Sequence, residues 1–302
     1  MKISYSRPLN DDEAVENFLY KQLRYREDRN IIPMIVKGEI ALPVYEDFPT
    51  STSKKFRVSE FREEDNRWEM RRQVVNELYD YKREGDDESI CLGRGGAAPL
   101  SEIKRNGDAV ILIGLPASGK SSIANTIAES YGAYILDSDF AKRKLPEFKN
   151  YEWGASLVHS ESDEIIFGYE HQPDDFESLL QKVSTDKTNI VIPKIGQKPE
   201  NIKILALVLQ KLGYNVHLIS VNLRREIATL RAVERYRATK RYVPLGLIFD
   251  GYSNDPILTY YILKSKENQL FASFGELSTE QRPPTVTDLE RDSPVKLFQN
   301  PI

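Results

Sequence analysis

The strongest chemical signature in the chain is the nine-residue stretch from Gly114 to Ser122, which fits the phosphate-binding pattern G-x-x-x-x-G-K-[ST]. Its glycines let successive backbone N–H groups curl around phosphate oxygens, and the N-terminus of a following helix adds a partial positive charge. The pattern places Lys120 against the β- and γ-phosphates of a nucleotide and makes the Ser121 hydroxyl a ligand of Mg²⁺. The predicted nucleotide-binding residues are Gly114, Leu115, Pro116, Ala117, Ser118, Gly119, Lys120, Ser121 and Ser122.

The residues on either side of this loop are those that a phosphate site requires. Residues 109–113 form a short apolar run rich in Val and Ile, typical of a buried parallel strand. After the lysine, Ile123, Ala124, Ile127 and Ala128 recur at helical spacing. An ordinary glycine turn would not need the lysine, the hydroxyl and both flanks. The order strand, glycine loop, helix therefore favours a nucleotide site.

Two carboxylates follow the next expected strand, residues 133–136. Asp137 and Asp139 are two positions apart at the strand end, so their side chains should point to the same side, near the phosphate loop. One carboxylate can hold Mg²⁺, directly or through water, and the other can accept the proton of an attacking hydroxyl. The alternative is an Asp-Ser-Asp turn that caps the following helix.

A helix dense in arginine is expected over residues 224–238. Arg231 and Arg235 share one face of it, and Arg241 lies just beyond its end. Guanidinium groups stabilise the charge that spreads over a phosphoryl group during transfer. A charged face turned to solvent would look the same, so the pattern alone does not decide between the two.

Composition limits the class of protein. The chain has 302 residues and a net charge of −4, which gives no overall basic field to argue for a nucleic acid partner. Its single cysteine, Cys91, excludes an intrachain disulfide and suits a reducing compartment. No apolar run approaches the ~18 residues of a membrane span, and no secretory signal follows Met1. We therefore expect a cytoplasmic protein without a membrane partner.

From residue 108 onward, expected strands and helices alternate. The strands are at 109–113, 133–136, 189–193 and 214–221, and helices are expected between them. This order predicts an α/β fold: a P-loop NTPase-type parallel sheet flanked by helices, with ligands at the carboxyl ends of its strands.

Four regions are predicted along the chain. Residues 1–85 should form a mainly helical N-terminal region, whose charged residues, Arg67 and Arg71 among them, we interpret as a solvated face. Between Ile31 and Thr50, prolines favour brief strands or irregular structure. Residues 86–107 are expected to be a flexible linker, 108–275 the P-loop domain, and 276–302 a polar tail that is largely frayed or disordered.

The segment from about Ala109 to Lys264 resembles the bacterial zeta toxin family of P-loop kinases. The loop alone is common to many families, whereas the ordered set of motifs is much more specific. The motifs are Gly-Leu-Pro-Ala-Ser-Gly-Lys-Ser-Ser (114–122), Leu-Asp-Ser-Asp (136–139), Lys-Leu-Pro-Glu-Phe (144–148), Val-His-Ser-Glu-Ser (158–162), Asn-Ile-Val-Ile-Pro-Lys-Ile-Gly (189–196), Arg-Tyr (235–236) and Arg-Tyr-Val-Pro (241–244).

Members of this family use ATP or GTP with Mg²⁺ to phosphorylate the sugar 3′-hydroxyl of UDP-N-acetylglucosamine, and a small antitoxin that blocks nucleotide access restrains them. The resemblance implies that Lys120 holds the β- and γ-phosphates and that Asp139 is the base on the sugar hydroxyl. It also implies that Arg235 and Arg241 clamp the transferring phosphoryl group. A place for Asp137 in the Mg²⁺ shell follows from its position two residues before Asp139.

One departure from the family concerns the acceptor. The best-known members carry Glu-Gly-Thr at the end of the strand equivalent to 189–193, where it helps to hold the sugar nucleotide; here the same place reads Pro-Lys-Ile-Gly (193–196). Lys194 could contact a substrate diphosphate or be an ordinary exposed lysine. His159 and Glu161, on one side of an expected helix, are further candidates for substrate binding, with a structural role as the alternative.

The predicted function is transfer of a γ-phosphoryl group to a hydroxyl of a nucleotide sugar, by a toxin of a toxin-antitoxin system. Two alternatives stay open: a kinase for another metabolite or a nucleic acid end, and a nucleotide-binding regulatory module without transfer activity. Residues 1–85 fall outside the resemblance. They could inhibit the kinase in place of a separate antitoxin, or simply stabilise it.

Overall fold

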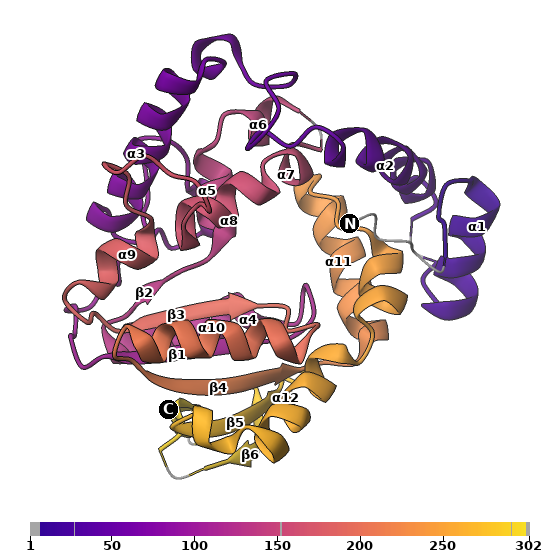
Figure 1. Ribbon diagram of the computed structural model, residues 1–302. Helices are drawn as coiled ribbons and strands as arrows, with labels where there is room; N and C mark the ends of the chain where they lie inside the picture. Colours follow the sequence, from indigo (N-terminus) through magenta and orange to yellow (C-terminus); the bar gives the residue numbers. More distant parts are fainter. Residues whose placement is uncertain (1–6, 27, 152, 291, 300–302) are drawn as a thin grey trace.

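A twisted sheet forms the centre of the molecule (Figure 1). The computed structural model describes residues 7–26, 28–151, 153–290 and 292–299. The sheet has six strands in the order β2-β3-β1-β4-β5-β6. Five strands run parallel, and β6 pairs antiparallel with β5. The strands are β1 (Asp108–Ile113), β2 (Tyr134–Ile135), β3 (Ile190–Lys194), β4 (Asn215–Asn222), β5 (Ser273–Ser278) and β6 (Thr285–Leu289). The predicted α/β fold with a mostly parallel sheet is confirmed.

Helices cover both faces of this sheet. Figure 1 shows α10 and α12 in front of the strands and α4 behind them. The helices from the phosphate loop onward are α4 (Lys120–Tyr131), α5 (Ser138–Lys144), α6 (Glu147–Asn150), α7 (Gly154–Leu157), α8 (His159–Phe167), α9 (Leu179–Ser184), α10 (Pro199–Lys211), α11 (Arg225–Thr239) and α12 (Asp255–Lys266). Short 3-10 or π-helical turns are η2 (Ser59–Phe61), η3 (Asp87–Ser89), η4 (Leu247–Tyr252), η5 (Asn268–Leu270) and η6 (Pro294–Phe298).

The strand β1 lies in the middle of the sheet and delivers the phosphate loop to the carboxyl edge. Ile111 is in register with Ile192 of β3 on one side and with Leu218 of β4 on the other. All three side chains are buried. A continuous apolar run is what a strand covered on both faces needs. Because β1 ends at Ile113, Gly114 opens the loop between the ends of β3 and β4.

The N-terminal residues are mainly helical, as expected, but they divide between two cores. They form α1 (Asp12–Asn17), the π-helical turn η1 (Phe18–Gln22), α2 (Ile31–Glu46) and α3 (Glu64–Asp80). The apolar side chains of α3, such as Val74 and Leu78, belong to the main core around the sheet. Those of α1, η1 and α2 form a second core with α11 and η4, including Phe18, Ile35 and Val233. The domain boundaries at residues 85, 107 and 275 stay a prediction.

The prolines between Ile31 and Thr50 do not prevent a helix, so the expectation of strands or irregular structure was wrong. Pro33 lies in the first turn of α2, where a missing N–H costs no intrahelical hydrogen bond. Pro43 lies inside the helix, which ends soon after it at Glu46. Burial of α2 side chains in the second core outweighs this local disadvantage.

The flexible linker expected over residues 86–107 is also wrong for the stretch around residue 97. Ile90, Ala97 and Ala98 are buried in the main core. The Ala97 carbonyl accepts a hydrogen bond from the Ile135 N–H at 3.1 Å, which ties this segment to the edge strand β2. At Gly96 a Cβ atom would lie 1.9 Å from a backbone oxygen. That glycine therefore allows a close backbone contact and does not mark flexibility.

The tail expected to be frayed is instead ordered over most of its length. Residues 273–278 and 285–289 form the last two strands of the sheet. Val295, on η6, is fully buried in the main core. The sequence analysis missed β6 because this edge strand has half-exposed side chains and therefore a polar sequence. Residues 300–302 lie outside the described part of the chain.

Within the ranges that the structure covers, no helix has both the length and the hydrophobicity of a membrane span.

Candidate active site

The phosphate loop joins β1 to α4 and closes around its own lysine. Ala117 and Gly119 have φ angles of 61° and 89°, in the left-handed region that a tight loop needs. Lys120, the first residue of α4, donates hydrogen bonds from Nζ to the carbonyl oxygens of Gly114 and Leu115, each at 2.7 Å. Burial lowers the pKa of Lys120 to about 8. The lysine therefore keeps its charge at neutral pH and holds it within the loop.

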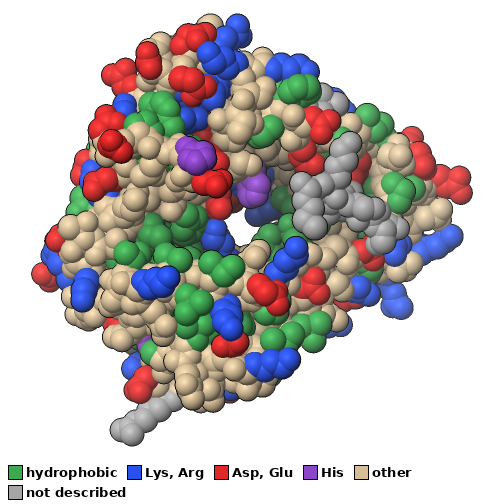
Figure 2. Space-filling view, in the orientation of Figure 1, with side chains coloured by type: hydrophobic (Ala, Val, Ile, Leu, Met, Phe, Trp, Pro, Cys, Tyr) green, Lys and Arg blue, Asp and Glu red, His purple; other side chains and the backbone are tan. Residues whose placement is uncertain are grey.

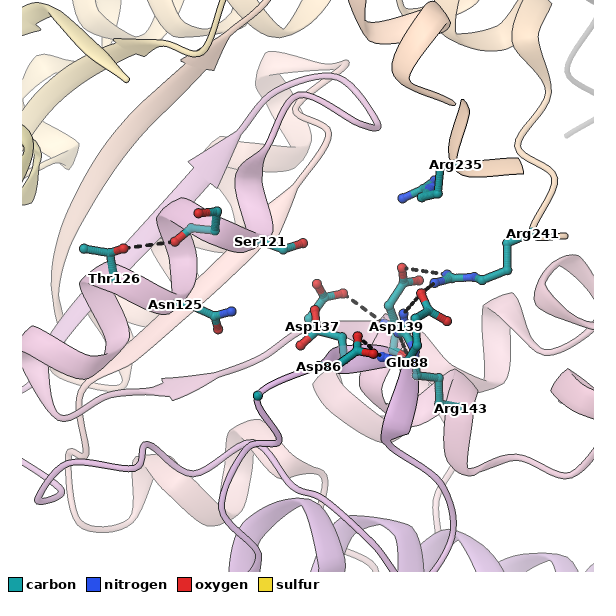
Figure 3. A pocket seen from close by; sticks show the side chains of 13 residues that line it. Asp86, Glu88, Ser121, Asn125, Thr126, Asp137, Asp139, Arg143, Arg235 and Arg241 are labelled. Atoms are coloured by element: carbon teal, nitrogen blue, oxygen red, sulfur yellow. Dashed lines mark hydrogen bonds and ion pairs between the residues drawn. The ribbon is translucent and has the colours of Figure 1, made fainter. Parts of the chain in front are cut away.

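Asp137 forms the helix cap that the alternative interpretation of the Asp-Ser-Asp motif predicts, and its role as a Mg²⁺ ligand stays a prediction. It caps α5, because its Oδ1 accepts a hydrogen bond from the Asp139 N–H at 2.9 Å. It also lines the cavities beside the phosphate loop, where it faces Ser121 (Figure 3). Burial and the neighbouring charge of Asp139 raise the pKa of Asp137. A carboxylate of this kind gains from a nearby cation.

Asp139 is held among positive charges. Its Oδ1 lies 3.0 Å from Lys142 Nζ and its Oδ2 lies 3.3 Å from an Arg241 terminal nitrogen. Burial alone would raise the pKa of Asp139, but the charges of Lys142, Arg241 and Arg143 hold it well below its usual range. Asp139 is therefore ionised at neutral pH and can accept a hydrogen bond from a hydroxyl.

The two arginines predicted to clamp a phosphoryl group reach the same cavity from α11 and the segment after it. Arg235 points into the open space across from Asp139 (Figure 3). Among the described residues its buried Nε finds no hydrogen-bond partner. Burial, together with the charge of Arg241, lowers the pKa of Arg235. Arg231, on the same helix, is instead tied to the carbonyl of Thr279 at 2.7 Å.

Two cavities meet at these residues. One has a volume of about 470 Å³ and the other of about 1070 Å³. Figure 2 shows the molecule hollowed at its centre, with hydrophobic as well as Lys, Arg and His side chains around the opening. The shared lining residues mark the place where both cavities meet the end of the phosphate loop. They are Ser121, Asp137, Asp139, Arg235 and Arg241.

Two of the three predicted acceptor residues line the larger cavity. His159 lies at the start of α8, and the charge of Lys142, with burial, lowers the pKa of His159 to about 4. The imidazole is therefore neutral at pH 7. Lys194, at the end of β3, lies 2.9 Å from Asp163 and 3.8 Å from the centre of the Phe167 ring. Asp163 also accepts a hydrogen bond from Ser138 at 2.7 Å.

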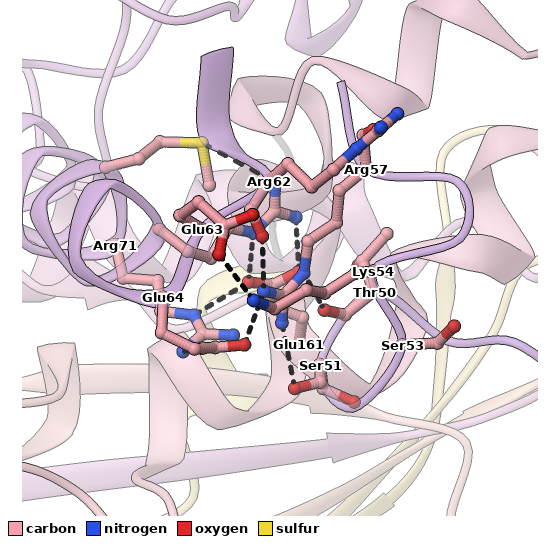
Figure 4. Close-up of polar contacts among 12 residues, drawn as sticks. Thr50, Ser51, Ser53, Lys54, Arg57, Arg62, Glu63, Glu64, Arg71 and Glu161 are labelled. Atoms are coloured by element: carbon pink, nitrogen blue, oxygen red, sulfur yellow. Dashed lines mark hydrogen bonds and ion pairs between the residues drawn. The ribbon is translucent and has the colours of Figure 1, made fainter. Parts of the chain in front are cut away.

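Glu161, the third acceptor candidate, lies elsewhere, and that prediction was wrong. Its carboxylate is fully buried and accepts hydrogen bonds from Arg67 and Arg71, each at 2.7 Å. Figure 4 shows Glu161 enclosed by side chains of the N-terminal region. Arg67 also pairs with Glu147 at 2.8 Å. The solvated face proposed for Arg67 and Arg71 was wrong too, because both side chains are buried.

Two acidic residues that pair with cations of the site, Glu88 and Asp163, were missed by the sequence analysis. Glu88, on η3, pairs with Arg143 at 3.0 Å and with Arg241 at 2.6 Å. Asp163 pairs with Lys194 and lies one helical turn from His159. The run Asp-Asp-Glu (86–88) was visible, but it was interpreted as the start of a linker. Glu88 and its partner Arg241 are separated by 153 positions in the sequence, and local sequence patterns do not extend that far.

The middle of the chain matches a known protein family. The family model described as "Zeta toxin" matches residues 100–253. No curated protein matches the chain.

Three solved structures are similar over larger parts of it, each at 17% identity or less. The first belongs to the PezAT chromosomal toxin-antitoxin system of Streptococcus pneumoniae: 17% identity, TM-score 0.46, covering 64% of this chain and 75% of that one. The second is a gluconokinase from Sinorhizobium meliloti: 17% identity, TM-score 0.33, with coverages of 59% and 86%. The third is the AvrRxo1-ORF1:AvrRxo1-ORF2 complex with sulphate ions: 15% identity, TM-score 0.45, with coverages of 76% and 66%.

Proposed function

This chain belongs to the zeta toxin family, and we propose that it is a kinase that transfers the γ-phosphoryl group of ATP or GTP to a sugar hydroxyl of a nucleotide sugar. One observation carries the proposal. Lys120, Asp139 and the pair Arg235 and Arg241 come from three separate parts of the chain, and all four line the same cavity. These are the charges that phosphoryl transfer needs, because catalysis of this reaction is mostly positioning and electrostatic stabilisation.

The part of the site around the phosphate loop fits a nucleoside triphosphate, the phosphoryl donor. Two polar side-chain atoms, Ser118 Oγ in the loop and Arg235 Nε on α11, are buried and have no hydrogen-bond partner within the described residues. Unpaired buried polar groups are costly unless a ligand satisfies them. Lys120 is already paired with two loop carbonyls and can turn towards phosphate oxygens. Arg235 would then stabilise the charge that develops on the transferring group.

Ser121 and Asp137 are the residues that would hold Mg²⁺. Both line the two cavities at their junction. Over the ranges the structure describes, no cluster of three or more His, Cys, Asp or Glu residues could hold a metal by itself. Mg²⁺ suits such a place because it usually takes one or two protein ligands and completes its shell with phosphates and waters. When bound, the ion neutralises phosphate charge.

The acceptor would enter through the larger cavity. Asp139 would accept the proton of the sugar hydroxyl, and its low pKa keeps it ionised for that task. Lys194, close to Asp163 and Phe167, would contact the diphosphate of a nucleotide sugar. The neutral imidazole of His159 can donate one hydrogen bond and accept another, as sugar hydroxyls require.

A small antitoxin protein is the partner that we propose, by analogy with the family. The alternative inhibitor, the N-terminal region, has less support from its position. As far as the structure describes α1 and α2, neither contributes a residue to the two cavities. Both contribute side chains to the second core, together with α11 and η4. This placement favours a stabilising role for these helices.

A product analysis tests the proposal. The protein is incubated with ATP, Mg²⁺ and a panel of nucleotide sugars that includes UDP-N-acetylglucosamine, and the products are identified by phosphorus NMR and mass spectrometry. We expect one new phosphomonoester on a sugar ring, absent with Asp139→Asn. A product on a different metabolite or on a nucleic acid end would overturn the acceptor class. Tight ATP binding with no product from any acceptor would support the regulatory module instead.

A further inference from the structure

Four charged residues, Glu88, Arg241, Arg143 and the predicted base Asp139, are joined in a closed ring. Glu88 Oε1 lies 2.6 Å from Arg241 and 3.0 Å from Arg143. Arg241 contacts the Asp139 carboxylate at 3.3 Å, and Arg143 donates to the Asp139 backbone carbonyl at 2.9 Å. Figure 3 shows this ring beside the open space into which Arg235 points. Glu88 is therefore linked to Asp139 indirectly, once through Arg241 and once through Arg143.

We infer that Glu88 is a positioning residue of the phosphoryl-transfer site: it fixes Arg241 and Arg143 so that the clamp and the base keep their places. The inference rests on the proposed function. It goes beyond the family resemblance, because Glu88 lies outside the residues that the family model matches, 100–253. The segment before the P-loop domain would thus complete the active site.

Arg241 gains from such a partner because it lies on a segment without regular secondary structure. α11 ends at Thr239, Lys240 follows in the left-handed region with a φ of 61°, and residues 240–244 have no regular structure. An arginine side chain on such a segment has several rotatable bonds and loses considerable entropy when it is fixed. Contacts with Glu88 and Asp139, one on each terminal nitrogen, restrict the guanidinium to one orientation.

Glu88 itself is anchored firmly enough for this task. It lies on η3, a short 3-10 turn whose preceding residue, Asp86, accepts a hydrogen bond from the Glu88 N–H at 3.0 Å. Ile90, two residues later, is fully buried in the main core. The turn is thus tied to the body of the protein on both sides of Glu88.

Glu88 also stabilises the positions of Arg241 and Arg143 by supplying a negative charge between them. Lys120, Lys142, Arg143, Arg235 and Arg241 all lie around the two cavities. Like charges at this density repel one another unless carboxylates lie between them. Without Glu88, Arg241 and Arg143 lose a shared counter-charge, and phosphate affinity should stay the same or rise while the geometry loosens. Turnover should therefore fall without a loss of nucleotide affinity.

The decisive experiment compares Glu88→Gln with Glu84→Gln in the full chain. Glu84 is the matched control, since it pairs with Arg94 at 3.1 Å on the surface, outside both cavities. For Glu88→Gln we expect kcat to fall on the order of 10- to 100-fold, with KM for the nucleotide unchanged or lower. Glu88→Asp, which keeps the charge, should recover part of the loss. Unchanged or increased turnover in Glu88→Gln would overturn the inference.

A double-mutant cycle separates positioning from general support of the fold. If Glu88 acts through Arg241, then Glu88→Gln adds little to the loss already caused by Arg241→Ala. Additive losses would show that Glu88 acts by another route. Melting temperatures of all variants should lie within a few degrees of the wild type, and a collapse of the Glu88→Gln fold would shift the comparison to Glu88→Asp.

A binding measurement keeps the inference testable apart from the acceptor. ADP with aluminium fluoride and Mg²⁺ imitates the transferring phosphoryl group, whereas ADP alone does not. Glu88→Gln should weaken the aluminium fluoride complex about 10-fold or more and leave ADP binding intact. Equal effects on both complexes would contradict positioning. If the wild type binds these complexes but phosphorylates no acceptor, the proposed function fails while this comparison still decides the role of Glu88.

Discussion

Two neighbouring aspartates show how single residues of the same type acquire different roles. Asp137 is partly buried and accepts a hydrogen bond from the Asp139 N–H at the start of α5, and burial and the charge of Asp139 raise its pKa. Asp139 lies between Lys142 and Arg241, and these charges hold its pKa low. Asp137 is therefore suited to bind a cation, and Asp139 is suited to accept a proton from a hydroxyl group.

Removal of the base should stop transfer without loss of nucleotide binding. Asp139→Asn keeps the shape of the side chain but removes the proton acceptor, so we expect kcat to fall on the order of 10²- to 10⁴-fold. Nucleotide affinity, measured by calorimetry, should change little. A variant that retains wild-type turnover would contradict the assignment of Asp139 as base.

Lys120 should give nucleotide binding a distinctive pH dependence. Its folded-state pKa of about 8 lies below the usual value of 10.5 because burial disfavours the charged form. In the free protein the ammonium is therefore present below pH 8 and is lost as the pH rises through 8. We expect affinity for a non-hydrolysable ATP analogue to decline across that range, and Lys120→Arg to lack the decline. Identical pH profiles for the two proteins would refute this explanation.

At the scale of elements, buried ion pairs join the N-terminal helix α3 to α8, the helix that carries His159 and Asp163. Arg67 contacts Glu147 and Glu161, and Arg71 contacts Glu161. All of these carboxylates and guanidinium groups are almost completely buried. Glu161 occupies the turn of α8 between His159 and Asp163, so these pairs set the position of both residues in the larger cavity.

Loss of Arg67 should destabilise the fold far more than loss of a surface arginine. Arg67→Met leaves two buried carboxylates without their main partner, which costs about 3–5 kcal/mol. The control is Arg72→Met, whose ion pair with Asp175 is exposed and is worth about 0–1 kcal/mol. Denaturant unfolding monitored by circular dichroism measures both changes. Similar stability of the two variants would contradict the role of the buried pairs.

The same pairs should make the protein sensitive to acid. Burial alone would raise the pKa of Glu161, but Arg67 and Arg71 lower it to about 2, below its usual value of 4.5. A depressed folded-state pKa contributes stability above pH 4.5, and this contribution is lost as the pH falls towards 2. The free energy of unfolding should therefore decline over that window, less steeply in Glu161→Gln. Parallel curves would exclude Glu161 as a source of the acid sensitivity.

At the scale of the whole molecule, the N-terminal helices support the arginine helix from the side opposite the sheet. Phe18 packs edge-on against Phe249 at 5.3 Å between ring centres, in the second core that also contains Val233 and Tyr236 of α11. Figure 1 shows α1 and α2 on the same side of the molecule as α11. The N-terminal helices thus share a core with the helix that carries Arg235.

A cavity in this second core should weaken both stability and activity. Phe18→Ala removes a ring that is 1% exposed, at a cost of about 3–5 kcal/mol. Ile40→Ala on α2 is the control, since Ile40 is 60% exposed and should change stability by about 0.5 kcal/mol or less. Thermal melting and kinase turnover measure both variants. Increased turnover in Phe18→Ala would instead favour inhibition by the N-terminal helices.

The sequence predicted the features that local patterns encode. The phosphate loop, the strands β1, β3 and β4 and the arginine helix all have short-range periodicity or fixed spacing. Contacts between distant residues had no such signal: Arg67 meets Glu161 across 94 positions, and Glu88 meets Arg241 across 153. For the same reason buried arginines were taken for a solvated face. Charge in a sequence does not reveal where tertiary structure will place its partner.

The most direct test of the kinase account is the fate of a labelled γ-phosphate. ATP carrying the label is mixed with the wild-type protein, Mg²⁺ and nucleotide sugars, and label in sugar phosphate is compared with label in free phosphate. We predict that the label appears mainly on a sugar, and that Lys120→Ala and Arg235→Ala each abolish this transfer. Label found only in free phosphate, or equal transfer by the variants, would contradict it.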